Sequence, residues 1–431
     1  MIMCKNLVFR PPKKKKTGKT KKKLGAIFAI LFIFLSSFYG RFDIANGFRL
    51  NSDAVAYADS GGQSEEDLKA ELEEEIDKQL SNLDFAEVET IIDNMSEQTK
   101  KLFASNSFYE KLNLVISGEY ADSSQSFFSA VASIFWQGLK GFLPIIASII
   151  AIAILGGMMS NLKPVSNGRP IGNIVHFVTY GVVIIFLGTS LTQILTMTQT
   201  TLNTIKALFD SVFPILLTLL TAVGGTVSVS IYQPAIALLS NIFVSLITYF
   251  LLPLFIFTMV FSLVGNLSNN VKMDKFVGFL QSTFKWTIGL CFTIFLGFIS
   301  IQGIMAGGVD GLSIRTAKFA IKSYVPIVGG YVSDGLSLIM ASSVLIKNAI
   351  GGVGIFVLFS MIISPILNLA LFMLSLKFMS GIIEPVGDKK IANFISDLGK
   401  SMSMLIALIV AVAFLYTVIT GLVMCSANLV V

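Results

Sequence analysis

Long windows without any charged residue dominate the chain beyond residue 140. Each window is long enough for the roughly 20 apolar residues that cross the hydrocarbon core of a bilayer. Because a membrane-spanning segment must satisfy its own backbone hydrogen bonds, these windows predict helices. The pattern therefore predicts an all-α, polytopic helical membrane protein. The charge-free windows are 141–162, 170–205, 211–271, 286–309, 348–376 and 401–431.

About seven hydrophobic helices fit this pattern, and together they predict a transmembrane domain over residues 139–431. Two of its segments, 211–234 and 307–348, have an interfacial or re-entrant character. In the second segment Arg315, Lys318 and Lys322 are spaced three and four residues apart, so they share one helix face, as in a helix that lies in the membrane interface. The predicted helices lie near 139–160, 173–195, 211–232, 235–264, 286–306, 349–376 and 401–424.

The start of the chain has a different pattern, with a lysine-rich stretch followed by the short apolar run Leu24–Leu35. A basic region before a short apolar run is typical of a secretory signal. Residues 1–40 are therefore either a cleaved signal peptide or an uncleaved anchor. In both cases the segment that follows is sent across the membrane.

Residues 41–138 form the most polar part of the chain, and we expect an acidic, helical, extracytoplasmic segment there. Leu68, Leu72, Ile76 and Leu80 repeat every four residues, which predicts one apolar helix face. Two interpretations remain open: a small helical hairpin that docks on another surface, or a solvated linker.

Charge is sorted along the chain more than its total suggests. Only 13% of residues are charged, whereas soluble domains have about a quarter. Ten of the 32 basic residues precede Leu24, and 15 of the 26 acidic residues lie within 51–100. The net charge of +6 is thus the sum of a basic tip and an acidic segment, and we expect no nucleic-acid partner.

Basic residues in the later loops predict the orientation, because short cytoplasmic loops carry an excess of Lys and Arg. If 211–232 turns back to the side that it entered, nine loop Lys and Arg residues lie in the cytoplasm and five lie outside. If 211–232 crosses the membrane, six lie in the cytoplasm and eight lie outside. The first arrangement fits the rule better. Its nine inside residues are Lys163, Arg169, Lys272, Lys275, Lys285, Lys377, Lys389, Lys390 and Lys400.

Two matching Gly-rich motifs interrupt the apolar windows. The pattern V-G-G-x-V-S occurs at 223–228 and again at 328–333, each time after a Pro-Ile pair. Paired Gly/Pro-interrupted segments in corresponding positions point to a translocation site, because broken helices expose backbone groups that must line a wet cavity or be buried in protein. Chance similarity between two Gly-rich membrane segments is the alternative interpretation.

Signatures of enzymes do not occur. A single histidine, His176, excludes a zinc-binding pair of histidines, and its place near a span end favours an interfacial role over a proton relay. The phosphate-loop, serine-nucleophile and dinucleotide patterns are each incomplete. We therefore expect no enzyme activity, no cofactor and no metal.

Three stretches resemble the conserved centre of the stage III sporulation protein AE family. They are 213–216 through Gly224-Gly225 to Tyr232-Gln233-Pro234-Ala235, the charged segment Val309–Phe319, and 325–334 together with Lys347-Asn348. The lysine-rich start is not part of this resemblance.

The resemblance implies a multi-pass cell-membrane protein of the mother-cell membrane around the forespore, required for forespore development. It further implies membership of a channel between the two cells, with ring-forming and other membrane proteins and a cytoplasmic secretion-type ATPase as partners, besides the lipid bilayer. A permease or export gate is the role inferred for this subunit, and a stand-alone secondary transporter built on an internal repeat is the alternative. The residues expected to line, gate or contact a partner are Gly224, Gly225, Pro234, Asp310, Arg315, Lys318, Pro326, Gly329, Gly330, Asp334, Lys347 and Asn348.

Overall fold

A computed structural model of the chain describes residues 65–103, 107–117, 124–161, 171–267, 273–324 and 329–426. These residues are helical apart from short turns, and the predicted signal or anchor lies outside them. Four short helices come first: α4 (Glu65–Ser81), α5 (Ala86–Asp93), α6 (Glu97–Phe103) and α7 (Phe108–Ile116). The long elements are α8 (Ser124–Asn161), α9 (Ile171–Ala222), α10 (Thr226–Leu246), the π-helical turn η1 (Ile247–Leu251), α11 (Leu252–Leu267), α12 (Asp274–Tyr324), α13 (Gly329–Val386) and α14 (Lys389–Cys425).

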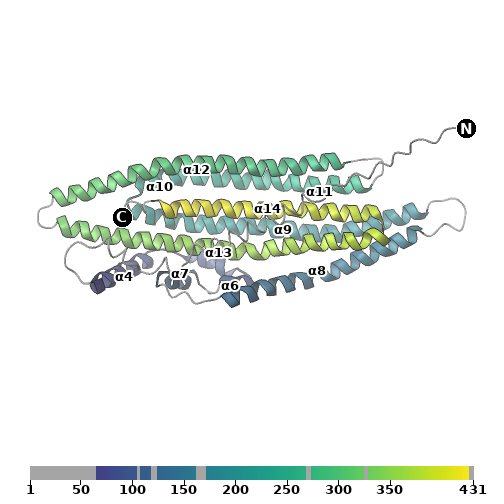
Figure 1. Cartoon of the computed structure of the whole chain (residues 1–431), viewed down its shortest axis with the longest axis horizontal. Coiled ribbons are helices and arrows are strands. Elements are labelled where there is room, and N and C mark those ends of the chain that lie inside the picture. The colour runs from purple at the N-terminus through teal and green to yellow at the C-terminus, as the bar shows by residue number, and fades with distance from the viewer. Residues whose placement is uncertain are drawn as a thin grey trace, which may run out of the picture.

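The long helices run up and down along one axis (Figure 1). Within the described residues, six helical passes are long and apolar enough to cross a membrane, which confirms the all-α membrane fold. The count is six and not seven because α9 is continuous where the sequence predicted two helices. Lys206 and Asp210, which interrupt the apolar pattern there, lie one turn apart and form an ion pair on the side of α9. Such a pair leaves the helix intact.

The chain reverses direction at Gly224. Residues 211–222 are the last turns of α9, and α10 runs back from Thr226. Gly224 has a φ of 89°, a conformation that glycine adopts without the steric cost paid by other residues. Segment 211–234 therefore consists of the last turns of α9, the turn at Gly224 and the first turns of α10, and its re-entrant character stays a prediction.

The two ends of the bundle differ in character. The helix ends that flank connections 162–170, 268–272 and 387–388 lie together (Figure 1), and we call this the basic end. The other end, which we call the Gly224 end, holds the α9–α10 turn, the end of α12, the start of α13 and the end of α14. The three connections share one end, as in the first of the two predicted topologies.

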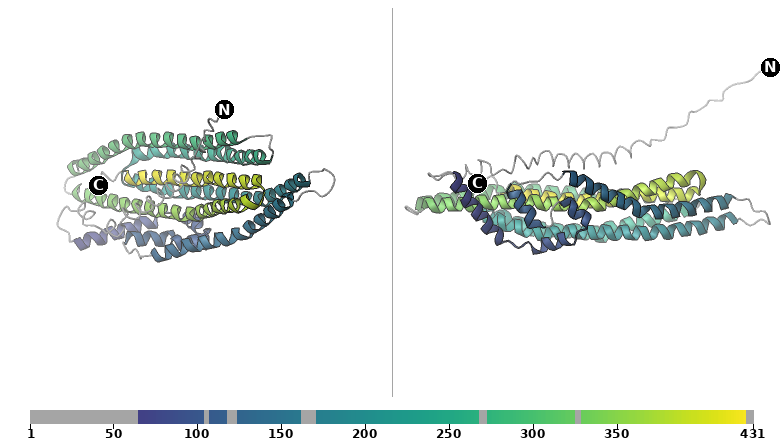
Figure 2. Two further views of the ribbon diagram at one scale, coloured as in Figure 1. Left: turned by 45° about the vertical axis from the view of Figure 1, so that its right-hand side comes forward. Right: turned by 90° about the horizontal axis from the view of Figure 1, so that it is seen from below.

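The long helices exceed the thickness of a membrane. The 58 residues of α13 extend for about 87 Å at 1.5 Å per residue, whereas a hydrocarbon core is about 30 Å thick. A large part of α13 must therefore lie outside the lipid. The short helices α4–α7 pack along the bundle on the side of α8 and α13, opposite α11 and α12 (Figure 2).

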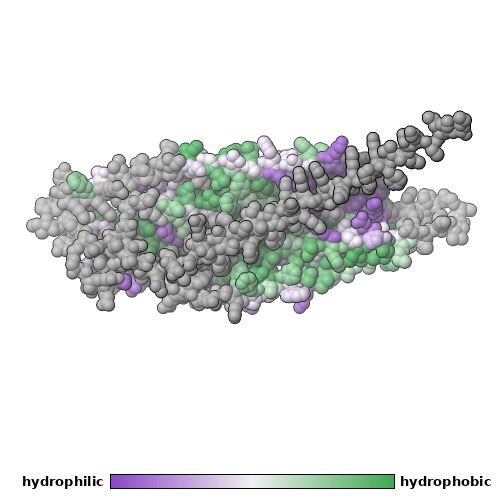
Figure 3. Space-filling view, in the orientation of Figure 1, coloured by the Kyte–Doolittle hydropathy of each residue, from purple (hydrophilic) through white to green (hydrophobic). Residues whose placement is uncertain are grey.

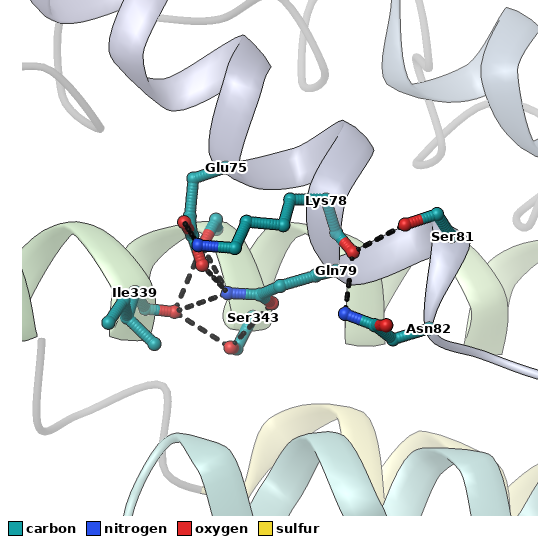
Figure 4. Close-up of polar contacts among 8 residues, drawn as sticks. Glu75, Lys78, Gln79, Ser81, Asn82, Ile339 and Ser343 are labelled. Atoms are coloured by element: carbon teal, nitrogen blue, oxygen red, sulfur yellow. Dashed lines mark hydrogen bonds and ion pairs between the residues drawn. The ribbon is translucent and has the colours of Figure 1, made fainter.

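Docking of α4–α7 decides between the two interpretations of the N-terminal segment. Leu72, Ile76 and Leu80 are buried in the same hydrophobic core as the long helices, so the segment is docked rather than a solvated linker. It is built from four short helices and not from a hairpin. The Gln79 side chain fixes the register: its amide nitrogen donates to Ser342 Oγ (2.9 Å), and Ser343 Oγ donates to its oxygen (2.8 Å), as Figure 4 shows around Gln79.

A buried lysine anchors α7. The ammonium of Lys111 lies over the rings of Phe103 (5.9 Å) and Phe356 (5.2 Å), which places a cation–π contact between α7 and α13. Burial lowers the pKa of Lys111, against a smaller opposing effect of Glu110. The apolar stem and the rings together make this a packing contact as well as an electrostatic one.

Large apolar side chains cover much of the outer surface of the bundle. Trp136 and Leu155 on α8, Phe257 on α11 and Trp286 on α12 are all exposed. Figure 3 shows hydrophobic surface over α8 and over the α10–α12 region of this face. Such extensive apolar exposure requires a bilayer as solvent. The chain is thus a multi-pass membrane protein.

Candidate functional site

The first turn of α10 needs hydrogen-bond acceptors from elsewhere. A helix begins with backbone N–H groups that have no partner within the helix. Here the N-cap residue is Gly225, which has no side chain to accept from them. The Gly-rich turn therefore leaves the positive end of α10 open to a group from another helix.

Asp310 on α12 provides that group. Its carboxylate accepts from the backbone N–H of Val227 (3.0 Å) and of Ser228 (3.1 Å), and also from the Ser228 hydroxyl. The Asp310 side chain is only 1% exposed. Charge-assisted hydrogen bonds at the positive end of a helix dipole compensate for the burial of the carboxylate. Asp310 thus fastens α12 to the start of α10.

A second charged residue has the opposite arrangement. Lys347 on α13 is fully buried, and its ammonium donates to the backbone carbonyl of Ser426 at the end of α14. A cation is favoured at the negative end of a helix dipole. The Ser426 hydroxyl pairs with the Tyr232 hydroxyl of α10 at 3.2 Å. Lys347 and Tyr232 therefore hold the C-terminal end of α14 between α13 and α10.

These groups form one site at the Gly224 end. We call Ser228, Tyr232, Asp310, Lys347 and Ser426 the polar cluster. It joins α10, α12, α13 and α14, with an acid at a helix start and a base at a helix end. Within the described residues no group of three His, Cys, Asp or Glu side chains could hold a metal ion. The geometry is that of a hydrogen-bonded contact that holds the ends of these four helices together.

A related device occurs in the N-terminal segment. Glu89 of α5 accepts from the backbone N–H groups of Phe108 (3.0 Å) and Tyr109 (3.1 Å) and from the Ser107 hydroxyl (2.7 Å) at the start of α7. Unlike Asp310, Glu89 is only partly buried. The pair offers a matched comparison between a carboxylate cap at the surface and one inside the bundle.

The structure brings together some of the residues that the sequence predicted as a site. Gly224, Gly225 and Asp310 meet at the start of α10, and Lys347 belongs to the same cluster. Asn348 follows Lys347, and its side-chain oxygen is buried without a hydrogen-bond partner among the described residues.

The other predicted residues lie apart or are only partly described. Pro234 is exposed on α10, and Gly329 and Gly330 begin α13. Arg315 and Lys318 lie on α12 and Asp334 on α13, where the structure describes the backbone alone. Pro326 lies outside the described residues. Residues 307–324 are the last part of α12, so the helix is continuous where the predicted segment 307–348 begins.

Three members of the cluster were missed by sequence reasoning. Ser228 closes the first V-G-G-x-V-S motif and Tyr232 begins the Tyr232–Ala235 stretch, but neither motif marks these two side chains as site residues. The signal for Ser228 is its third position in a helix that starts with a glycine cap. Ser426 contributes a backbone carbonyl, which no sequence pattern marks.

The two V-G-G-x-V-S motifs occupy similar places. The first lies at the turn from α9 into α10, and the second lies where α13 begins after α12. Both are at the Gly224 end, where a helix starts back toward the basic end (Figure 1). The final serines, Ser228 and Ser333, are both buried.

Comparisons with known proteins place the chain in one family. The family model for stage III sporulation protein AE matches residues 107–427, which include the whole polar cluster. Stage III sporulation protein AE of Bacillus subtilis (strain 168) is 24% identical over 314 residues, which cover 73% of this chain and 79% of the relative. No solved structure matches the chain.

Proposed function

Because this chain belongs to the stage III sporulation protein AE family, we propose that it is the membrane-embedded subunit of a channel that links mother cell and forespore. The strongest support is that the residues matched by the family model are the same residues that form the multi-pass bundle. The match runs from α7 to the end of α14, so it includes every candidate span in the described residues. A role in sporulation follows from the family; the channel and gate are our proposal.

The proposed orientation puts the basic end in the cytoplasm of the mother cell. Exposed Lys275 and Lys389 lie near helix starts at that end. The Gly224 end, with the polar cluster and the docked helices α4–α7, then faces the space between the two cells. A cytoplasmic secretion-type ATPase would meet the basic end, and ring-forming partners would meet the Gly224 end.

In this proposal the polar cluster sets the width of the bundle at its outer end. Four helices are held there by a few buried polar groups, and the gate opens if one of these helices leaves the cluster. The charged positions Arg315 and Lys318, on the outer part of α12, are proposed contacts for lipid headgroups, a partner protein or an anionic solute. Gly224 and Gly225 supply the turn about which α10 can move.

A stand-alone transporter is the alternative, and one observation favours it. Both V-G-G-x-V-S motifs lie at helix starts at the same end, as a repeat of two helical hairpins would place them. However, each candidate span has a window with at most two charged residues, which leaves little for ion coupling.

Purification separates the two functions. From sporulating cells, we expect the tagged full-length chain to co-purify with other membrane proteins and with a cytoplasmic ATPase, and to be inactive alone in liposomes. The control is the same tagged chain from growing cells, where the partners are not made. A protein that purifies alone and drives solute uptake in liposomes by itself would overturn the channel proposal in favour of the transporter.

A further inference from the structure

The exposed face of α9 changes character along its length. From Ile174 to Phe186 the exposed side chains are apolar, as expected against lipid. From Thr189 to Thr221 no large apolar side chain of α9 is exposed. The exposed residues there follow a spacing of three and four, which makes a single stripe along the helix. The stripe also contains the exposed Ala207 and Pro214. We call its polar members the α9 polar face: Thr189, Thr192, Gln193, Thr196, Gln199, Thr200, Asn203, Asp210, Thr218 and Thr221.

Two contacts fix the level of this face within the bundle. The Tyr180 hydroxyl donates to the Leu263 carbonyl at 3.0 Å, which ties the first part of α9 to α11. Farther along, Tyr416 stacks on Phe209 (4.4 Å between ring centroids) and hydrogen-bonds Ser240 (3.0 Å), which ties α9 to α10. Along the axis of the bundle, the part of the polar face from Thr189 to Asn203 therefore lies at the same height as residues between 240 and 263, which belong to α10, η1 and α11.

At that level the other side of the bundle faces lipid. Tyr249, Phe250, Ile256 and Phe257 are exposed there, and Tyr249 is 81% exposed. Polar and apolar exposed surfaces thus occur at one depth on different helices. Beside Thr200–Ala207 the docked segment is itself a neighbour of α9, because Ile91, Asn94 and Thr99 line the same hollow. The exposed polar residues from Thr189 to Gln199 lie at the depth of the lipid-facing residues and require another solvent or a partner.

Threonines alone would not require water. Thr189, Thr192 and Thr204 donate their hydroxyl hydrogens to carbonyls of the preceding turn, and threonines satisfied in this way tolerate lipid. The carboxamides of Gln193, Gln199 and Asn203 are different, because each has two donors and an acceptor. Exposure of three such groups to acyl chains is costly, so they indicate contact with water or with protein.

The polar face is also hollowed. A cavity of about 350 Å³ between α8, α9 and α13 has a mixed lining, whose polar members are Gln137, Gln193, Ser364 and Asn368. A cavity of about 610 Å³ follows, between Thr200–Ala207 of α9, α13 and the docked segment, which contributes Asn94 and Thr99. One of about 540 Å³ lies between α9 and α10 at Lys206–Thr221. The hollows succeed one another along α9 toward the Gly224 end. Apolar side chains also line each hollow, but a series of hollows that each contain polar groups suits a column of water better than a tightly packed protein contact.

We propose that the α9 polar face is one wall of a water-filled path through the membrane. This inference rests on the proposed channel function and identifies where solute would pass. Between Thr189 and Asn203 the wall has hydroxyl and carboxamide groups but no charge, and Lys206 and Asp210 neutralise each other beyond it. The path therefore takes small hydrophilic solutes with little selection by sign of charge. Other chains packed around α9 complete the path.

Cysteine labelling tests this wall in native membranes. In the full-length chain with Cys4, Cys291 and Cys425 replaced by Ser, single cysteines are placed at Thr192, Thr196 and Asn203. The matched controls at the same level are Ile256→Cys and Phe257→Cys, which face lipid. A charged, membrane-impermeant thiol reagent should react with the first set at least about tenfold faster, because a thiol among acyl chains stays protonated as well as out of reach.

Two results keep the test decisive. Thr→Cys is nearly isosteric, so Thr192→Cys and Thr196→Cys report on the wall even if Asn203→Cys disturbs the helix. If cysteines at positions 192 and 196 react no faster than those at the lipid-facing control positions, the inference is overturned. Spore yield of the cysteine-free parent is measured in parallel: normal yield with unreactive positions rejects the wall but leaves the channel function standing.

Discussion

Replacing Asp310 by Asn is expected to lower the free energy of unfolding by about 2–3 kcal/mol. A buried donor left without its acceptor costs about 1–3 kcal/mol, and Asn keeps one acceptor oxygen where the carboxylate has two. The neutral amide also loses its attraction to the positive end of α10. Its NH₂ group would face the N–H groups that Asp310 now accepts from. The start of α10 should loosen from α12.

Thermal unfolding in detergent measures this effect, and spore yield reports its consequence. Destabilisation of this size is enough to reduce the amount of protein several-fold in cells. Glu89→Gln is the matched control, because Glu89 caps α7 in the same way near the surface, where water can replace the lost acceptor. An Asp310→Asn protein as stable as the Glu89→Gln protein would show that the cap on α10 is unimportant.

Replacing Lys347 by Ala is expected to have a similarly large effect, about 3 kcal/mol or more. Removing one partner of a buried charged interaction is strongly destabilising, and Ala also leaves a cavity beside α14. The carbonyl of Ser426 would lose the ammonium that it accepts from. The last turn of α14 should then separate from α13, which can be followed by protease cleavage near the C-terminus.

Lys347→Met distinguishes packing from charge. Met fills a similar volume, and replacing a buried ionic group by an apolar one of similar shape is often neutral or stabilising. We therefore expect Lys347→Met to unfold close to the wild-type temperature while the Ala variant does not. A Met variant that is stable but yields no spores would mean that the ammonium acts in the gate. Equal stability of the Ala variant and the wild type would contradict the role given to Lys347 in the polar cluster.

The general fold could be predicted from the sequence because charge-free windows report directly on membrane helices. The windows at 348–376 and 401–431 correspond to parts of α13 and α14. Helix lengths could not be predicted, because a charged residue such as Lys206 indicates a connection, here between the predicted helices 173–195 and 211–232. An ion pair within one turn removes that signal, and only the neighbouring helices decide where a helix of 52 residues ends.

Part of the site could also be predicted. The sequence predicts the Gly224-Gly225 pair and Asp310 as site residues, but nothing in their separation along the chain indicates that they meet. That contact depends on α12 running antiparallel to α10 with Asp310 at the right height. The α9 polar face was missed because its threonines and carboxamides are uncharged, so the window 170–205 was interpreted as apolar throughout. Its periodicity would have been the available signal.

Labelling of single cysteines in intact, growing cells tests the central claim most directly: six membrane passes with the basic end in the cytoplasm and α4–α7 outside. Lys389→Cys and Lys101→Cys make the same chemical change at exposed positions near the basic end and on α6. In a background with Cys4, Cys291 and Cys425 replaced by Ser, an impermeant thiol reagent should label position 101 and spare position 389, which reacts only after the membrane is permeabilised. Labelling of position 389 in intact cells, or protection of position 101, would contradict this topology.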